Sequence, residues 1–270
     1  MTTSATHTPP IDDMPRGGPD ASWLSRRLQT DVLEYTDRYD IPDRIKQYVV
    51  TALDDMGTRQ GTHASTAQLA VDLVAGIDHP RILELGAGHG RLSDHILHRH
   101  LTAELTISDL DPHSVNNVAN GPLGHHPRVK TKVVDATNID DPDDSYDLVV
   151  FANAFHHLPP SVAVKAIADA TRVGKTFLIV DLKRMPSLAL ALLPLTIPAI
   201  AFRVRPLAAA RAVMHDAYIS ALRAYSPSAF TALGKAADPA MQIEFLPTPT
   251  SRLRSIALTF RRPGTSRTVA

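Results

Sequence analysis

The stretch RILELGAGHGRLS, residues 81–93, decides the fold. A short apolar run, typical of a buried strand, ends in three glycines at positions 86, 88 and 90. Glycine loses more conformational entropy on folding than any other residue, so three in one turn indicate that something approaches the main chain closely. A glycine-rich turn between a strand and a helix places that approach at the carboxyl edge of a parallel sheet.

Short β-branched runs and helical stretches alternate on both sides of this turn, which is typical of a parallel sheet with both faces covered. The pattern predicts an α/β fold: a Rossmann-like, seven-stranded, mostly parallel sheet with helices on both faces. The expected strands are 81–85, 104–109, 129–134, 146–152 and 176–182, with helices at 91–100, 112–119, 161–172 and 226–236. The last two strands, 242–246 and 254–260, are close enough in sequence to form an antiparallel hairpin.

Helical periodicity before the first strand predicts three N-terminal helices. One covers 23–39 with a single apolar stripe, and a third begins near Thr62 or Ser65 and ends at Gly76. The second follows Pro42, and its expected inward-facing residues are Ile45, Val49, Leu53 and Met56.

Composition limits the class of protein. The 270 residues are 44% hydrophobic and 21% charged, which allows a sizeable core. The 28 basic residues equal the 28 acidic ones, so the basic excess of a nucleic-acid-binding protein is missing. Without cysteine, disulfides and thiolate sites are impossible. The first twenty residues lack the apolar core of a signal peptide, and we expect a flexible tail and a cytoplasmic protein.

The apolar stretch 187–202 has three interpretations: a pair of helices over a hydrophobic pocket, a membrane-surface contact, or a membrane span. It is shorter than the ~20 residues that a span needs, and Pro194 and Pro198 interrupt it. We therefore favour a lid. The expected organisation is a tail at 1–20, a helical cover at 21–76, a core at 77–185 and 223–263, a lid at 186–222 and a tail at 264–270.

The glycine spacing and the residue before it point to the ligand. Dinucleotide sites use Gly-x-Gly-x-x-Gly to fit a pyrophosphate, whereas this chain has Gly-x-Gly-x-Gly preceded by Glu84. A carboxylate there favours a cationic, amine-bearing ligand over a phosphate. The stretch resembles the first motif of class I S-adenosylmethionine-dependent methyltransferases.

Three later segments extend the resemblance. LTISDLDPHSV places Asp109 at the end of the second strand, VVDATNI places Asp135 after the third, and SYDLVVFANAFHH leads the fourth with Asp147. The resemblance implies S-adenosyl-L-methionine as cofactor, with Asp109 on the ribose hydroxyls and Asp135 near the adenine amine. Asp135 could also be a turn residue only, and Asp147 is expected to be structural. The implied cofactor-binding residues are Glu84, Gly86, Ala87, Gly88, Asp109, Leu110, Asp135, Ala136 and Asn153.

The end of the fourth strand faces the methyl group in such enzymes, so the segment NAFHHL decides the chemistry. It resembles the small-molecule branch, similar to the methyltransferases of ubiquinone and menaquinone synthesis. We expect an apolar or aromatic small-molecule acceptor methylated at oxygen or carbon, with His156 or His157 as general base and His215 as a further candidate.

Alternatives stay open. An amine acceptor would need no base, a protein of this fold could have lost catalysis, and the fold also serves other adenosyl-ligand chemistry. His95 and His98 lie one turn apart but have no evident third ligand, so we expect no metal site. Nothing in the sequence indicates the oligomeric state, and a membrane contact is the less favoured partner.

Overall fold

The computed structural model describes residues 11–38, 40–196, 207–248 and 255–264. In these residues one seven-stranded sheet has the order β3-β2-β1-β4-β5-β7-β6. The first five strands are parallel, and β7 pairs antiparallel with both β5 and β6. The predicted Rossmann-like, mostly parallel sheet is thus confirmed. The strands are β1 (Arg81–Leu85), β2 (Glu104–Asp109), β3 (Val129–Val133), β4 (Leu148–Ala152), β5 (Phe177–Leu182), β6 (Gln242–Leu246) and β7 (Ser255–Arg261).

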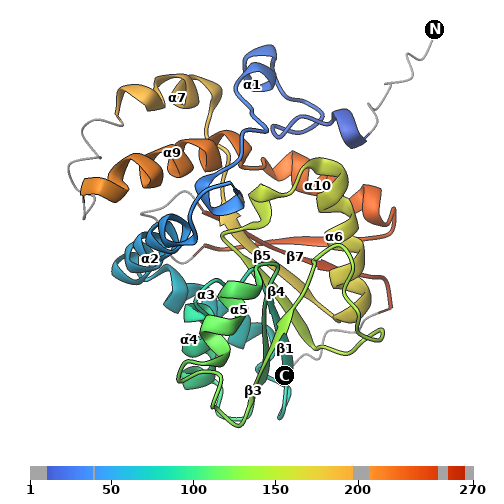
Figure 1. The fold of residues 1–270 in the computed structure, drawn as a ribbon. Helices are drawn as coiled ribbons and strands as arrows, with labels where there is room; N and C mark the ends of the chain where they lie inside the picture. The colour runs from blue at the N-terminus through green and yellow to red at the C-terminus, as the bar shows by residue number, and fades with distance from the viewer. Residues whose placement is uncertain (1–10, 39, 197–206, 249–254, 265–270) are drawn as a thin grey trace, which may run out of the picture.

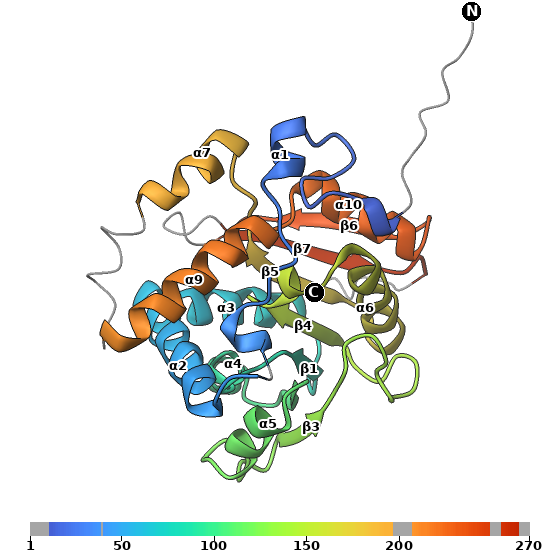
Figure 2. The ribbon, with the colours of Figure 1, turned by 45° about the horizontal axis from the view of Figure 1, so that its top comes forward.

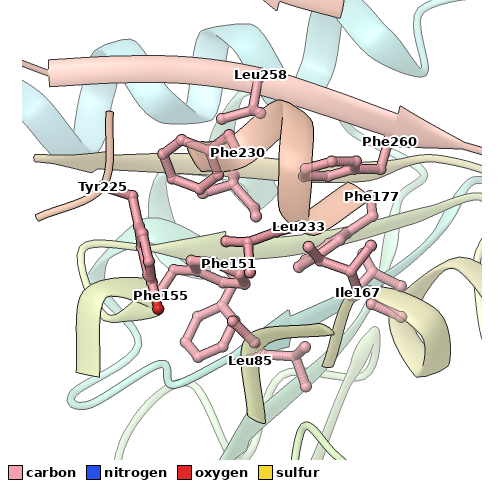
Figure 3. Packing of buried hydrophobic residues seen from close by; sticks show 14 of the residues in the cluster. Leu85, Phe151, Phe155, Ile167, Phe177, Tyr225, Phe230, Leu233, Leu258 and Phe260 are labelled. Carbon is pink, nitrogen blue, oxygen red and sulfur yellow. The ribbon is translucent and has the colours of Figure 1, made fainter. Parts of the chain in front are cut away.

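Helices cover both faces of the sheet, as Figure 1 shows. On one face, α3 and α4 contribute buried aliphatic side chains and α5 adds Val118. On the other face, α6 and α10 pack on a cluster rich in aromatic residues, with Phe155 at its centre (Figure 3). These helices are α3 (Thr62–Leu73), α4 (Arg91–Arg99), α5 (Pro112–Ala119), α6 (Pro160–Val173) and α10 (Pro227–Ala237).

Local sequence explains where several helices begin. Asp111 precedes α5, and its side chain accepts a hydrogen bond from the backbone N–H of His113. Ser226 caps α10 in the same way. Both helices, and α6, have proline at the first turn, where no intrahelical N–H is needed.

A third group of elements lies over the carboxyl ends of the parallel strands. It consists of α2 (Asp43–Gln60), α9 (Leu207–Arg223) and the short 3-10 helix η2 (Tyr35–Asp37), which contact one another. Figure 2 shows the N-terminal segment running beside α9 at the strand ends, with α2 next to the lower end of α9. The strand ends, where ligands bind in open α/β sheets, are therefore covered by residues remote in sequence.

The N-terminal prediction was wrong in two places. The expected helix over 23–39 is broken into α1 (Trp23–Arg27) and η2, and Val32 and Leu33 between them are 53% and 50% exposed. The apolar stripe therefore does not face the core, and the segment instead runs extended so that Glu34 becomes buried. In α2, Val49 is buried as expected, but Met56 is exposed and Gly57 takes the inward position.

The apolar stretch 187–202 is described only as far as residue 196. It forms α7 (Ser187–Leu192) and the 3-10 helix η4 (Leu193–Leu195), and residues 197–202 lie outside the described residues. Leu190 is fully buried, whereas Leu188, Leu192 and Leu195 are exposed. Among the described residues, no helix is both long enough and apolar enough to cross a membrane.

Candidate functional site

The glycine loop connects β1 to α4 in left-handed backbone conformations. Gly86, Gly88 and Gly90 have φ values of 62°, 54° and 73°, a region that L side chains rarely adopt. A Cβ atom on Gly86 would lie 2.9 Å from the Phe151 ring, so there the glycine is required by packing against β4. A Cβ atom on Gly88 would meet only Val50 of α2, at 3.6 Å, so a side chain here would fill space between the loop and α2.

Hydrogen bonds hold this loop against the end of β2. The backbone N–H of Ala87 donates to the carbonyl of Ser108, and that of Gly88 donates to Oδ2 of Asp109, both at 2.9 Å. Burial raises the pKa of Asp109 above its usual value, although the backbone N–H groups of Asp111 and Gly88 oppose the shift. The structure thus brings together two parts of the predicted cofactor site that lie about twenty residues apart.

Glu84, the acidic residue before the glycines, is buried at 3% exposure. The hydroxyl of Ser93 on α4 donates a short hydrogen bond to its carboxyl group. Burial raises the pKa of Glu84 to about 8, and the bonds from Ser93 only partly oppose this. A carboxyl group in this state becomes charged readily when a cation approaches it.

The other predicted cofactor residues follow the carboxyl ends of β2, β3 and β4, on both sides of the point between β1 and β4 where the strand order changes direction. Asn153 follows β4 with φ of 56°, a conformation for which asparagine is among the few suited residues. Leu110 is 57% exposed at the end of β2. The carboxylate of Asp135 accepts hydrogen bonds from the N–H and hydroxyl groups of Thr137, the turn role that the sequence left open, and Ala136 is half-buried. Their cofactor contacts stay predictions.

His156 lies in the 3-10 helix η3 (Phe155–His157) and is enclosed by carboxylates. Its Nδ1 is 2.7 Å from Oδ1 of Asp181, its backbone N–H donates to the other oxygen of Asp181, and Nε2 lies 3.5 Å from Oε1 of Glu34. Burial alone would lower the pKa of His156, but Asp181 and Glu34 raise it to about 10. Such a group keeps its proton at neutral pH, so the geometry disfavours His156 as the general base.

His157 is more accessible, with a side chain 20% exposed. Its Nδ1 is 2.6 Å from Oδ1 of Asp37, and its Nε2 is 3.7 Å from Oε2 of Glu34. Arg223 of α9 holds the other oxygen of Asp37 at 2.7 Å. Burial would raise the pKa of Asp37, but the hydrogen bond from His157 and the charge of Arg223 lower it to about 2.

His215, the third histidine predicted to be catalytic, lies on α9, whereas His156 and His157 lie on η3. Its ring meets Tyr35 edge-on at 5.0 Å, and its Nδ1 is 2.9 Å from Asp216. None of the interactions in the described part of the chain joins His215 to His156 or His157. A catalytic role for His215 stays a prediction without support from this geometry.

Sequence reasoning missed the acidic partners of the histidines. Asp181 is the last residue but one of the apolar strand β5, and a carboxylate near the end of such a strand could have been recognised by its position. Asp147 directly precedes β4, at the opposite end of the sheet, and has structural partners as predicted: it accepts hydrogen bonds from the backbone N–H of Arg81 and the ammonium of Lys175. No sequence pattern marked Glu34 and Asp37 as partners of the histidines, because only the tertiary fold brings the N-terminal segment to η3.

Comparison with known proteins agrees with this geometry. Residues 82–176 match the family model described as "Methyltransferase domain". A malonyl-[acyl-carrier protein] O-methyltransferase of Geobacter sulfurreducens is 32% identical over 105 residues, which is 39% of this chain and 38% of that relative. The matched region thus spans well under half of the relative.

Solved structures show the same fold over most of the chain. The plantazolicin methyltransferase BamL, in complex with a triazolic desmethylPZN analogue and SAH (S-adenosylhomocysteine), has a TM-score of 0.59 at 13% identity, over 88% of this chain and 95% of that one. An O-methyltransferase family 2 protein from Planctomyces limnophilus, in complex with apigenin, has a TM-score of 0.57 at 18% identity, over 88% and 65%.

The match to a methyltransferase domain thus covers residues 82–176, about a third of the chain. The residues at the strand ends fit S-adenosylmethionine in two respects. The carboxylate of Asp109, an acceptor-only group, suits a pair of ribose hydroxyls, and the buried carboxyl group of Glu84 suits an ammonium. At Gly88, the absence of a side chain leaves the main chain open to a ligand.

Proposed function

We propose that the protein is an S-adenosylmethionine-dependent methyltransferase that acts on an apolar or aromatic small molecule. The observation that carries the proposal is the hydrogen bond from the Gly88 N–H to Asp109, because it joins the glycine loop to the predicted ribose-binding carboxylate. When bound, the cofactor supplies a methyl group on a positively charged sulfur. The chain's own residues have to bind the cofactor, align the acceptor and exclude water.

Each cofactor-binding residue has a distinct task in this proposal. Asp109 accepts hydrogen bonds from the ribose hydroxyls, and Leu110, exposed beside it, packs on the adenine. Asp135 and Ala136 lie near the adenine edge, and Asn153 orients groups at the end of β4. Glu84, buried near the end of β1, balances the positive charge of the amino group of the cofactor.

The acceptor is proposed to be apolar because α7 and η4 expose leucines rather than charges. Methylation at oxygen or carbon requires a proton to leave the acceptor. Of the three histidines, His157 is best placed to receive it, since its side chain is partly exposed while that of His156 is enclosed. The two O-methyltransferases that the chain resembles agree with an oxygen acceptor.

A two-part experiment tests the proposal. Calorimetry with S-adenosylhomocysteine should show binding at one site, and labelled-methyl transfer should be measured against phenols, quinols and amines of similar size. We expect transfer to a phenol or quinol, and we expect His157→Ala to slow it about 10²–10⁴-fold. Transfer to amines that is unaffected by His157→Ala would contradict oxygen or carbon methylation. Cofactor binding without transfer to any class would favour a non-catalytic role, and no binding would overturn the proposal.

A further inference from the structure

Three side chains from two distant parts of the chain meet at η3: Glu34, His156 and His157. One ligand atom of each, an imidazole nitrogen or a carboxylate oxygen, lies within 4.8 Å of the other two. Glu34 and His156 are buried, and His157 is half-buried. Two histidines and one carboxylate form a donor set used by divalent transition metals such as zinc.

Each imidazole ring is fixed in an orientation that suits metal binding. His156 and His157 both direct Nδ1 toward a carboxylate, Asp181 at 2.7 Å and Asp37 at 2.6 Å. In a neutral ring, a carboxylate at this nitrogen favours the tautomer with the proton on Nδ1, which leaves a lone pair on Nε2. His156 is protonated in the metal-free protein, so an ion bound at its Nε2 has to displace that proton. Metal-binding histidines commonly have such a carboxylate partner behind them.

The two free nitrogens face the same carboxylate at distances too long for strong ion pairs. Nε2 of His156 is 3.5 Å and Nε2 of His157 is 3.7 Å from an oxygen of Glu34. Nε2 of His156 is also buried without a hydrogen-bond partner in the described part of the chain. Two atoms bound at about 2.0–2.1 Å to a tetrahedral zinc ion lie about 3.3–3.4 Å apart. The observed separations, which go to Oε1 and Oε2 of Glu34 respectively, are slightly longer than this, so the side chains would have to close in a little around an ion.

The neighbouring residues surround the site with negative charge, which attracts a cation, and they hold the Glu34 carboxylate in place. The hydroxyl of Ser220 on α9 donates to Oε1 of Glu34 at 2.9 Å. With both imidazoles neutral, the carboxylates outnumber the guanidinium groups by two, a difference that one divalent cation balances. The charged groups counted are Glu34, Asp37, Asp181, Asp216, Arg16 and Arg223.

We propose that Glu34, His156 and His157 bind one divalent transition-metal ion, with zinc as the best-fitting metal. The two imidazole donors disfavour magnesium and calcium, which prefer oxygen ligands. Three protein ligands leave a further coordination position open, and the partly exposed His157 marks the side from which an ion can enter. The inference can be tested without methyl transfer, but it competes with the general-base role proposed for His157, because both roles use the lone pair on Nε2.

Cobalt(II) is the probe, because its visible absorption reports the ligand set directly. The full chain is treated with a chelator, and cobalt(II) is added under conditions in which circular dichroism shows a folded protein. We expect one ion per chain, a tetrahedral-type spectrum, and displacement by zinc but not by magnesium. Zinc should also raise the melting temperature, as a ligand specific to the folded state does.

Variants assign the site. Glu34→Gln keeps the side-chain volume, and His157→Ala removes a partly exposed ring, so both are expected to fold; each should weaken cobalt binding about 100-fold or more. Asp37→Asn, behind His157, should weaken it about 10–100-fold. His98→Ala removes a ring that is 75% exposed on α4 and should change nothing.

Two outcomes would overturn the inference. One is the absence of stoichiometric cobalt or zinc binding by the folded wild-type chain, which would leave the cluster as a network of ion pairs only. The other is binding that survives both Glu34→Gln and His157→Ala, which would place the ion elsewhere. Asp109→Ala separates this site from the cofactor site, since it should impair S-adenosylhomocysteine binding and leave cobalt binding unchanged.

Discussion

Asp109 is the residue on which the proposed cofactor site depends most. Its carboxylate already holds the glycine loop, and in the complex it would accept hydrogen bonds from two hydroxyls. Loss of two such bonds costs about 2–4 kcal/mol, so Asp109→Ala should weaken S-adenosylhomocysteine binding about 30- to 1,000-fold by calorimetry.

Asp111 provides the matched control. Its side chain caps α5 and bonds the backbone N–H of His113, two residues from Asp109. Asp111→Ala should therefore reduce stability by about 1 kcal/mol without a comparable loss of cofactor affinity. Equal losses of affinity in the two variants would contradict the role assigned to Asp109.

Glu84 predicts a pH dependence of stability in the cofactor-free protein. Its pKa is about 8 in the folded chain against an ordinary value of 4.5, because burial disfavours the charged form. Between these two values the native state holds a proton that the unfolded state has lost, so stability falls as pH rises through this window. Glu84→Gln cannot ionise, so its melting temperature should decline less from pH 5 to pH 9.

Glu104 is the control for that profile, since it is an exposed glutamate at the start of β2. Glu104→Gln should retain the wild-type pH profile of the melting temperature. At pH 9, Glu84→Gln should also be the more stable protein by a few kcal/mol. Identical profiles for wild type and Glu84→Gln would show that Glu84 is charged in the folded state.

At the scale of elements, the glycine loop can be tested against a second glycine with the same backbone. Gly88 and Gly61 have φ of 54° and 70°, and a Cβ atom at Gly61 would meet nothing within 4 Å. Alanine at either position should cost about 1 kcal/mol of stability from strain in the left-handed region. Only Gly88→Ala should also weaken cofactor binding, because only there does the added carbon enter the proposed ligand space.

The exposed leucines of α7 and η4 are predicted to contact the acceptor and to contribute little to the stability of the fold. Leu192 and Leu195 are 49% and 76% exposed, so aspartate at either position should leave the melting temperature within about 1 °C. It should raise the acceptor KM more than the cofactor Kd if this surface contacts an apolar acceptor. Leu190→Asp is the contrasting variant, because Leu190 is fully buried and its loss should destabilise the fold.

Elements built from local patterns were predictable from sequence, and contacts between remote segments were not. The ends of β1, β2 and α5 agree with the prediction, because apolar runs, the glycines and Asp111 mark them directly. The segment 23–39 was predicted as a helix from its periodicity, but Glu34 and Asp37 are drawn to the histidines of η3. A long-range ion pair overrides a weak local propensity and leaves no trace in the spacing of apolar residues.

At the scale of the whole molecule, Phe155 connects the core to the histidine cluster. Its ring lies 5.6–6.4 Å from those of Phe177, Tyr225 and Phe230, and His156 follows it directly. Phe155→Ala should lower the free energy of unfolding by about 3–5 kcal/mol in urea titrations, because the cavity opens at a fully buried position.

Phe245 of β6 is the control, since its side chain is 44% exposed. Phe245→Ala should cost much less, about 1 kcal/mol or below. If Phe155→Ala were equally mild, the aromatic cluster of Figure 3 would contribute little to holding the sheet against α10.

The crossing of the N-terminal segment over the strand ends has a consequence for the timing of folding. Glu34 leaves the ribosome more than a hundred residues before its partners His156, Ser220 and Arg223. Contacts so far apart in sequence form late, because the intervening chain must first be ordered. During synthesis, the histidine cluster therefore stays incomplete until α9 has emerged. A nascent chain ending before α9 can pair its parallel strands, but it cannot complete the cluster of charged side chains at their carboxyl ends.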